Sequence, residues 1–217
     1  MNFNNDPSQR VVIHSTDLSW QPGQAVGVQH RLLAGQDEED AQTTSIVRYE
    51  PGAIFSSYEH PLGDEIVVLE GEFEDEYGNY PAGTYLKNPP VSRHAPRSTV
   101  GCTLFVKYRH LEDRDSEQVV IRPTDWSWRP GLVNGLDVFA LSQFDTTHTA
   151  LVHWAPGTFF NKHHHFGGEE ILVLQGTFQD EYGDYPSGTW IRSPHMSSHQ
   201  PFSEPGCLIF VKVGHLL

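Results

Sequence analysis

Short runs of aliphatic, β-branched and aromatic residues, separated every few positions by Gly and Pro, form the dominant hydrophobic pattern of this chain. The strands expected in the first half cover 43–50, 65–70, 72–73, 83–86 and 103–107, and those in the second half cover 149–155, 170–175, 177–178, 188–191 and 208–212. No segment keeps the 3.6-residue apolar period over the roughly ten residues that a helix needs. The pattern therefore predicts an all-β protein.

The sequence is also internally duplicated. The decapeptide Asp-Glu-Tyr-Gly-Asn-Tyr-Pro-Ala-Gly-Thr at 75–84 returns 105 residues later, at 180–189, with eight of its ten positions identical. A repeat of this length is a domain rather than a solenoid unit. We therefore expect two barrels, at 1–111 and 119–217, joined by a polar linker at 112–118.

Each copy of about 100 residues contains many short strands and several Pro-Gly and Tyr-Gly turns, which favours a double-sheet jelly roll. An immunoglobulin-like sandwich is the alternative, but the chain lacks the Cys, Trp, Cys spacing of that fold. Cys102 and Cys207 occupy equivalent positions in the two copies, and we expect both to be small buried core residues rather than disulfide partners.

The formal net charge of −14 argues against direct binding to nucleic acid, because no cluster of Lys and Arg offsets it. No apolar run approaches the roughly 20 residues of a membrane-spanning helix, and the first ten residues lack the apolar stretch of a signal peptide. We therefore expect no membrane association and a cytoplasmic location.

The second copy contains a cluster of residues that commonly bind metals. His163 and His165 are two positions apart, so on an extended strand both side chains point to one face while His164 points to the other. A Gly-Gly turn follows and returns Glu169 toward the two imidazoles, and His199 supplies a fourth donor from a later strand. Three imidazoles and one carboxylate suit Zn, Fe, Ni, Cu or Mn, and they suit Ca or Mg poorly.

The first copy carries an altered set at the matching positions, namely Tyr58, His60, Asp64 and His94. A phenol with an ordinary pKa of about 10 binds divalent ions weakly, so we expect a weaker second site or an empty one. Glu65 can substitute in this copy if the loop shifts by one residue. In the second copy, His195 is either a partner at the mouth of the barrel or a solvent-exposed loop residue.

These motifs resemble those of a known family. The spacing of Gly157, His163, His165, Glu169 and Gly176 resembles the first motif of the cupin superfamily, and the stretch from Pro186 and Gly188 to His199 resembles the second. The resemblance covers the core of both copies. It implies two tandem cupin-type barrels of the double-stranded β-helix, or jelly-roll, kind.

Within the cupins, the phrases at 169–174, 178–183 and 197–199 are similar to the cupin half of the ChrR anti-sigma factors and to acetylacetone-cleaving dioxygenases. The ChrR resemblance implies a zinc site at His163, His165, Glu169 and His199. The dioxygenase resemblance implies an iron site at the three histidines with Glu169 nearby. ChrR proteins that inhibit a sigma factor also carry a helical domain with a His-x-x-x-Cys-x-x-Cys motif, and no such motif precedes the first copy here, which argues against direct inhibition of a sigma factor.

Two kinds of function follow from these resemblances. One is a zinc-binding regulatory or sensory module of a transcriptional stress response, acting through a small molecule or a protein partner in a sigma-factor pathway, as a monomer or a homodimer. The other is a mononuclear non-haem metal dioxygenase or lyase that acts on a small dicarbonyl or aromatic substrate. Zinc is the expected cofactor of the first, and iron, nickel, manganese or copper are the alternatives.

Overall fold

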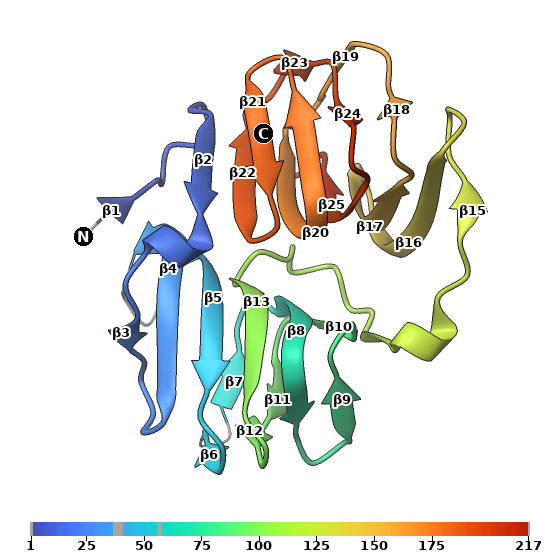
Figure 1. The fold of residues 1–217 in the computed structure, drawn as a ribbon. Helices are drawn as coiled ribbons and strands as arrows, with labels where there is room; N and C mark the ends of the chain where they lie inside the picture. Colours follow the sequence, from blue (N-terminus) through green and yellow to red (C-terminus); the bar gives the residue numbers. More distant parts are fainter. Residues whose placement is uncertain (1, 37–40, 56–57, 217) are drawn as a thin grey trace. The chain divides into compact units, whose positions relative to one another are not determined.

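The computed structural model describes residues 2–36, 41–55 and 58–216. Over these residues the chain forms β-strands and two short 3-10 helices, η1 (Ser15–Asp17) and η2 (Pro123–Asp125), and this confirms the all-β prediction (Figure 1). None of the helices in the described segments has the length and apolar character needed to cross a membrane.

The chain divides into two compact units, which contain 1–5 with 18–126 and 6–17 with 127–217. The strands of the first unit are β1 (Asn2–Phe3), β3 (Gln21–Pro22), β4 (Val28–Gln36), β5 (Thr43–Tyr49), β6 (Ala53–Ile54), β7 (Tyr58–His60), β8 (Asp64–Glu74), β9 (Asn79–Pro81), β10 (Tyr85–Asn88), β11 (Ser92–His94), β12 (Arg97–Ser98), β13 (Cys102–Tyr108) and β14 (Val119–Ile121). Those of the second unit are β2 (Val11–His14), β15 (Arg129–Pro130), β16 (Leu136–Phe144), β17 (Thr147–Trp154), β18 (Thr158–Phe159), β19 (His163–His164), β20 (Glu169–Asp180), β21 (Gly183–Pro186), β22 (Thr189–Ser193), β23 (Ser198–His199), β24 (Phe202–Ser203) and β25 (Cys207–Val213).

Both units have the same antiparallel topology. The larger sheet of the first unit runs β1-β4-β5-β13-β8-β10-β14, and that of the second runs β15-β16-β17-β25-β20-β22-β2. Each unit also contains a separate two-stranded ladder, β7 with β11 in the first and β19 with β23 in the second. Tandem cupin-type jelly rolls, as expected from the sequence, account for this arrangement.

The longest strands, β8 and β20, each contribute to both layers of their barrel. The N-terminal part of β8 pairs with β10 and β13, and its C-terminal part pairs with β9 and β12. Gly71 and Gly176 lie at the bend, with φ of +72° and +71°, and a Cβ there would overlap the carbonyl oxygen of Gly101 or Gly206. The break expected after 65–70 and 170–175 is therefore a glycine bend within one continuous strand.

The compact units differ from the domains expected from the sequence. The strand β2, which opens the first repeat, pairs with β22 of the second unit, and β14, which opens the second repeat, pairs with β10 of the first unit. Segments at the start of each repeat are therefore exchanged. The expected linker, 112–118, contains no strand, and its Asp115 accepts a 2.7 Å hydrogen bond from the buried Lys87 ammonium of β10.

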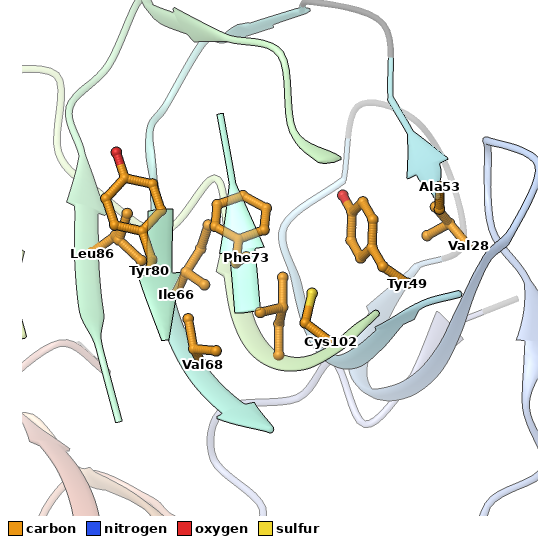
Figure 2. Packing of buried hydrophobic residues seen from close by; sticks show 10 residues of the cluster. Val28, Tyr49, Ala53, Ile66, Val68, Phe73, Tyr80, Leu86 and Cys102 are labelled. Carbon is orange, nitrogen blue, oxygen red and sulfur yellow. The ribbon is translucent and has the colours of Figure 1, made fainter. Parts of the chain in front are cut away.

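Aromatic and aliphatic side chains fill the interior of each barrel. In the first, Phe73 lies between Tyr49 and Tyr80, with ring centroids 6.1 and 6.0 Å away (Figure 2). The equivalent core of the second barrel is built around Trp154, Phe178 and Tyr185. Cys102 and Cys207 are free and buried in these cores, as expected, and burial raises the pKa of each thiol to about 11.

Candidate metal centre

The histidine cluster of the second unit lies where strands β19 and β23 pair. In this ladder His163 is directly opposite His199, so two candidate ligands from distant parts of the sequence are neighbours. His165 follows β19 immediately, and Glu169 begins β20. The turn between them passes through Gly167 and Gly168, both with left-handed φ, and a Cβ at Gly167 would lie 2.6 Å from the backbone of Gly214. Glycine is thus required for the turn that brings Glu169 back to the imidazoles.

The three imidazoles meet around a common point. Ring centroids are 4.6 Å apart for His163 and His165, 4.8 Å for His165 and His199, and 5.1 Å for His163 and His199. One nitrogen from each ring can be chosen so that all three lie within 4.8 Å of one another. Glu169 completes one side of the cluster, because its Oε2 lies 3.5 Å from Nε2 of His165 and 3.6 Å from Nε2 of His199.

Burial controls the protonation of this cluster. Burial lowers the pKa of His165 to about 3, with further lowering by the neighbouring imidazoles, and it also lowers the pKa of His163. Burial raises the pKa of Glu169 to about 7, against the opposing effect of His199. At neutral pH, His165 is therefore a neutral imidazole with a lone pair to share, and Glu169 is only partly ionised because burial disfavours its charged form.

Hydrogen bonds from the outer nitrogens fix two of the rings. Nδ1 of His163 lies 2.9 Å from the carbonyl oxygen of Asn161, and Nδ1 of His199 lies 3.3 Å from Oδ2 of Asp180. A proton on Nδ1 leaves the Nε2 lone pair of each ring for the interior of the cluster. This is the arrangement usual for histidines that bind metals.

Asp180 is itself held by a network that the sequence analysis did not assign to the site. Its Oδ1 accepts hydrogen bonds from the Tyr185 hydroxyl at 2.6 Å and from the Tyr182 N–H at 2.8 Å, and Arg10 lies 3.3 Å from its Oδ2. Burial acts to raise the pKa of Asp180, but the bonds from His199, Tyr185 and Tyr182 outweigh it and hold the pKa below its usual range. The signal was present in the sequence, because the repeated decapeptide begins with this aspartate in both copies.

The residues present fit a divalent transition metal. Nε2 of His165, Nε2 of His199 and Oε2 of Glu169 are buried and make no hydrogen bond within the described part of the chain. Leaving such polar atoms unsatisfied costs free energy, which a bound cation would offset. His163, His165, His199 and Glu169 would hold the ion, and it would supply Lewis-acid polarisation of a bound molecule.

The two remaining histidines of this region have other roles. His164 is exposed, as expected from its alternation with His163 and His165. His195 accepts a 2.9 Å hydrogen bond at Nδ1 from the backbone N–H of Gly167, and its ring packs 5.0 Å from that of Phe166. His195 is exposed in the loop between β22 and β23, as one of the two expectations for it had it, and from there it supports the turn before Glu169.

The first barrel brings together three of its four candidate residues. Ligand atoms of the buried His60, Asp64 and His94 lie within 4.8 Å of one another. Nδ1 of His60 is 3.0 Å from Oδ2 of Asp64, and Nδ1 of His94 is 3.2 Å from Oδ2 of Asp75, the counterpart of Asp180. The two barrels thus share the same supporting aspartate.

The fourth candidate, Tyr58, lies in β7 opposite His94, but its side chain falls outside the part of the chain that the structure describes. Glu65 does not substitute for Asp64. The two are consecutive on β8 and point to opposite faces, and the Glu65 carboxylate accepts a 2.8 Å hydrogen bond from the Tyr85 hydroxyl.

Comparison with known families gives matches to the ChrR Cupin-like domain at 8–112 and again at 116–217. The chain belongs to this cupin family. It is a bicupin, because each repeat accounts for one match. No curated protein sequence matches it.

Solved structures show the same fold at low sequence identity. A candidate dioxygenase from Nostoc punctiforme superposes with a TM-score of 0.80 at 15% identity, over 95% of the bicupin and 83% of that chain. The protein Ylba from E. coli gives 0.72 at 13% identity, over 96% and 92%. Oxalate decarboxylase from Lactobacillus farciminis, in a formate complex, gives 0.68 at 10% identity, over 99% and 88%. At these identities the likeness establishes the fold alone.

Proposed function

We propose that the second barrel binds one zinc ion through His163, His165, Glu169 and His199, and that the bicupin is a regulatory or sensory module of a stress response. The observation that carries the metal site is the buried carboxyl of Glu169, placed 3.5 and 3.6 Å from imidazole nitrogens and without a hydrogen bond at Oε2. Three neutral imidazoles and one carboxylate are a ligand set that zinc accepts.

A ligand set of four protein groups favours a structural or sensory role for the ion. An ion that binds only the folded state stabilises that state in proportion to the logarithm of its concentration, so metal loss can change the surface that a partner recognises. The family match to the ChrR Cupin-like domain supports a protein partner in a regulatory pathway. The net charge of −14 supports action through protein or small molecule rather than through DNA.

One feature favours the second candidate, a metal-dependent dioxygenase or lyase. His163 is only half-buried, whereas His165, Glu169 and His199 are buried, so the cluster is least covered on the side of His163. If Glu169 remained apart from a bound iron, three histidines would hold it and leave coordination positions for a substrate. Metal identity therefore separates the two candidates.

Elemental analysis of protein purified without added metal tests the site. We expect about one equivalent of zinc per chain, its loss in His165→Ala, and its retention in His164→Ala, since His164 is exposed. Two equivalents in the parent protein, or metal retained in His165→Ala, would contradict the proposal. Iron accompanied by O₂ uptake on a dicarbonyl compound would favour the enzyme instead.

A further inference from the structure

The first barrel, whose metal-ligand set is altered, contains a cavity of about 290 Å³. Residues from β4, β5, β8 and β13 line it, together with loop residues and with His94 of β11. Ligand pockets commonly range from about 300 to 1,000 Å³, and an engineered cavity of about 150 Å³ holds benzene. The space therefore suits a molecule of one substituted ring.

The strand register arranges the lining in rows. Asp64 and Tyr108 are direct partners in one row, Ile66 and Val106 in the next, and Leu104 with Val47 in the row beyond. Asp64 and Tyr108 make one end of the cavity polar, and the following rows are apolar except for Ser45 beside Val106 and His30 beside Val47. The ring centroids of Tyr49 and Phe73 are 6.1 Å apart, and both rings add aromatic surface on which a ligand ring can pack (Figure 2).

Three of the polar side chains that line the cavity of the first barrel are replaced by apolar ones at the matching positions of the second barrel. At three lining positions with the same register in both copies, the first barrel has a hydrogen-bonding side chain and the second an aliphatic one. The exchanged pairs are Ser45 for Ala150, Tyr108 for Val213 and His30 for Val138. The repeat with fewer imidazoles for a metal thus has more groups with which to orient an organic ligand.

The charges around the cavity select the type of ligand. The carboxylate of Asp64 is buried, and a hydrogen bond of 2.8 Å from Asn88 and a contact of 3.0 Å from His60 fix its position. A carboxyl group offers several acceptor sites, so a hydroxyl of the ligand can donate to it. The net charge of −14 disfavours an anionic ligand.

We propose that the first barrel binds an uncharged, hydroxylated single-ring compound in this cavity, with a hydroxyl directed to Asp64, Tyr108 and Ser45 and the ring against Tyr49 and Phe73. This site is separate from the metal site proposed for the second barrel and does not depend on it. The bicupin would then divide two tasks between its repeats, with a metal held in one and an organic ligand in the other.

Calorimetric titration of the full-length chain with 1,3-dihydroxybenzene tests the proposal, because the two hydroxyls of this probe are too far apart to chelate a metal. We expect saturable binding of one molecule, at least about tenfold weaker in a Ser45→Ala, Tyr108→Val double variant that loses two hydrogen bonds. Alanine and valine already occupy the matching positions of the second barrel, as Ala150 and Val213, so we expect the first barrel to tolerate these replacements. Ala150→Ser is the matched control and should bind like the parent.

The proposal would be overturned by no saturable binding, by equal affinity in the double variant, or by benzoate binding as tightly as 1,3-dihydroxybenzene. The His165→Ala variant separates this site from the metal site. We expect this variant to bind 1,3-dihydroxybenzene with unchanged affinity. Loss of binding would indicate that the probe binds in the second barrel, and it would reject the assignment to the first. Circular dichroism and the metal content of the double variant show whether its fold is intact.

Discussion

Nδ1 of His199 lies 3.3 Å from Oδ2 of Asp180, and this contact recurs in the first barrel between His94 and Asp75 at 3.2 Å. Asp180 is the last residue of β20, and Asp75 directly follows β8, the equivalent long strand of the first repeat. A buried carboxylate that receives a ring N–H fixes the tautomer and the orientation of the imidazole. The first residue of the repeated decapeptide therefore contacts a candidate metal ligand in each barrel.

Replacement of Asp180 should weaken metal binding without removing a ligand. In Asp180→Asn we expect about 10- to 100-fold lower affinity, because His199 loses the acceptor that orients it. Competition with a chromophoric chelator measures the change. The exposed Asp184→Asn is a matched control and should leave affinity unaltered.

The Asp180 carboxylate should make the free energy of unfolding of the metal-free protein depend on pH in the acidic range. The pKa of Asp180 is lowered in the folded chain from an ordinary value of 3.8. The stabilisation is therefore present above that ordinary value and is lost as pH falls through the folded pKa. Urea midpoints measured from pH 6 down to pH 2 should show a gap between parent and Asp180→Asn that narrows below about pH 4. A gap that does not change with pH would reject this origin.

Conversion of Tyr58 to histidine should create a second complete set of imidazoles. Tyr58 faces His94 across the β7–β11 ladder, as His163 faces His199 across the β19–β23 ladder. We expect the metal content of Tyr58→His to rise toward about two equivalents per chain. Unchanged stoichiometry by elemental analysis would mean that His60, Asp64 and His94 cannot form a site even with the added ligand.

Two glycines with similar φ should differ in their tolerance of alanine. Gly157 and Gly176 have φ of +77° and +71°, but no atom lies within 4 Å of a Cβ at Gly157, whereas a Cβ at Gly176 would overlap the carbonyl oxygen of Gly206. Gly157→Ala should cost about 1–2 kcal/mol from backbone strain. Gly176→Ala should cost at least about 2 kcal/mol more, because the strands must also move apart. Denaturant unfolding of both variants measures the difference, and equal losses would contradict it.

The sequence predicted the fold class and the convergence of the histidines well, for physical reasons. Alternation along His163 to His165 determines which rings share a face, and the glycine turn leaves Glu169 little choice of direction. By contrast, β4 and β16 were not predicted. Strand β4 reads Val-Gln-His-Arg-Leu-Leu-Ala-Gly-Gln, and its apolar residues are clustered rather than alternating.

Other features depend on tertiary pairing and could not be predicted from local pattern. Arg10 reaches Asp180 only because β2 joins the second unit, and nothing near residue 10 in the sequence indicates this. The polar lining at Ser45 and Tyr108 depends on strand register, which a single sequence does not fix. The signal for Asp180 was the repetition of its motif, which indicated duplication but not contact with a ligand.

Because β2 and β14 each pair with a strand of the other repeat, neither repeat can complete its larger sheet with its own residues alone. A fragment ending near residue 112 would carry β2 without β22, and its own β10 would lack β14. Each fragment would present a bare row of amide and carbonyl groups, which is a template for association with another chain. The two halves, if synthesised separately, should thus associate with one another or self-associate. Joining the repeats in one chain therefore protects these strand edges from aggregation.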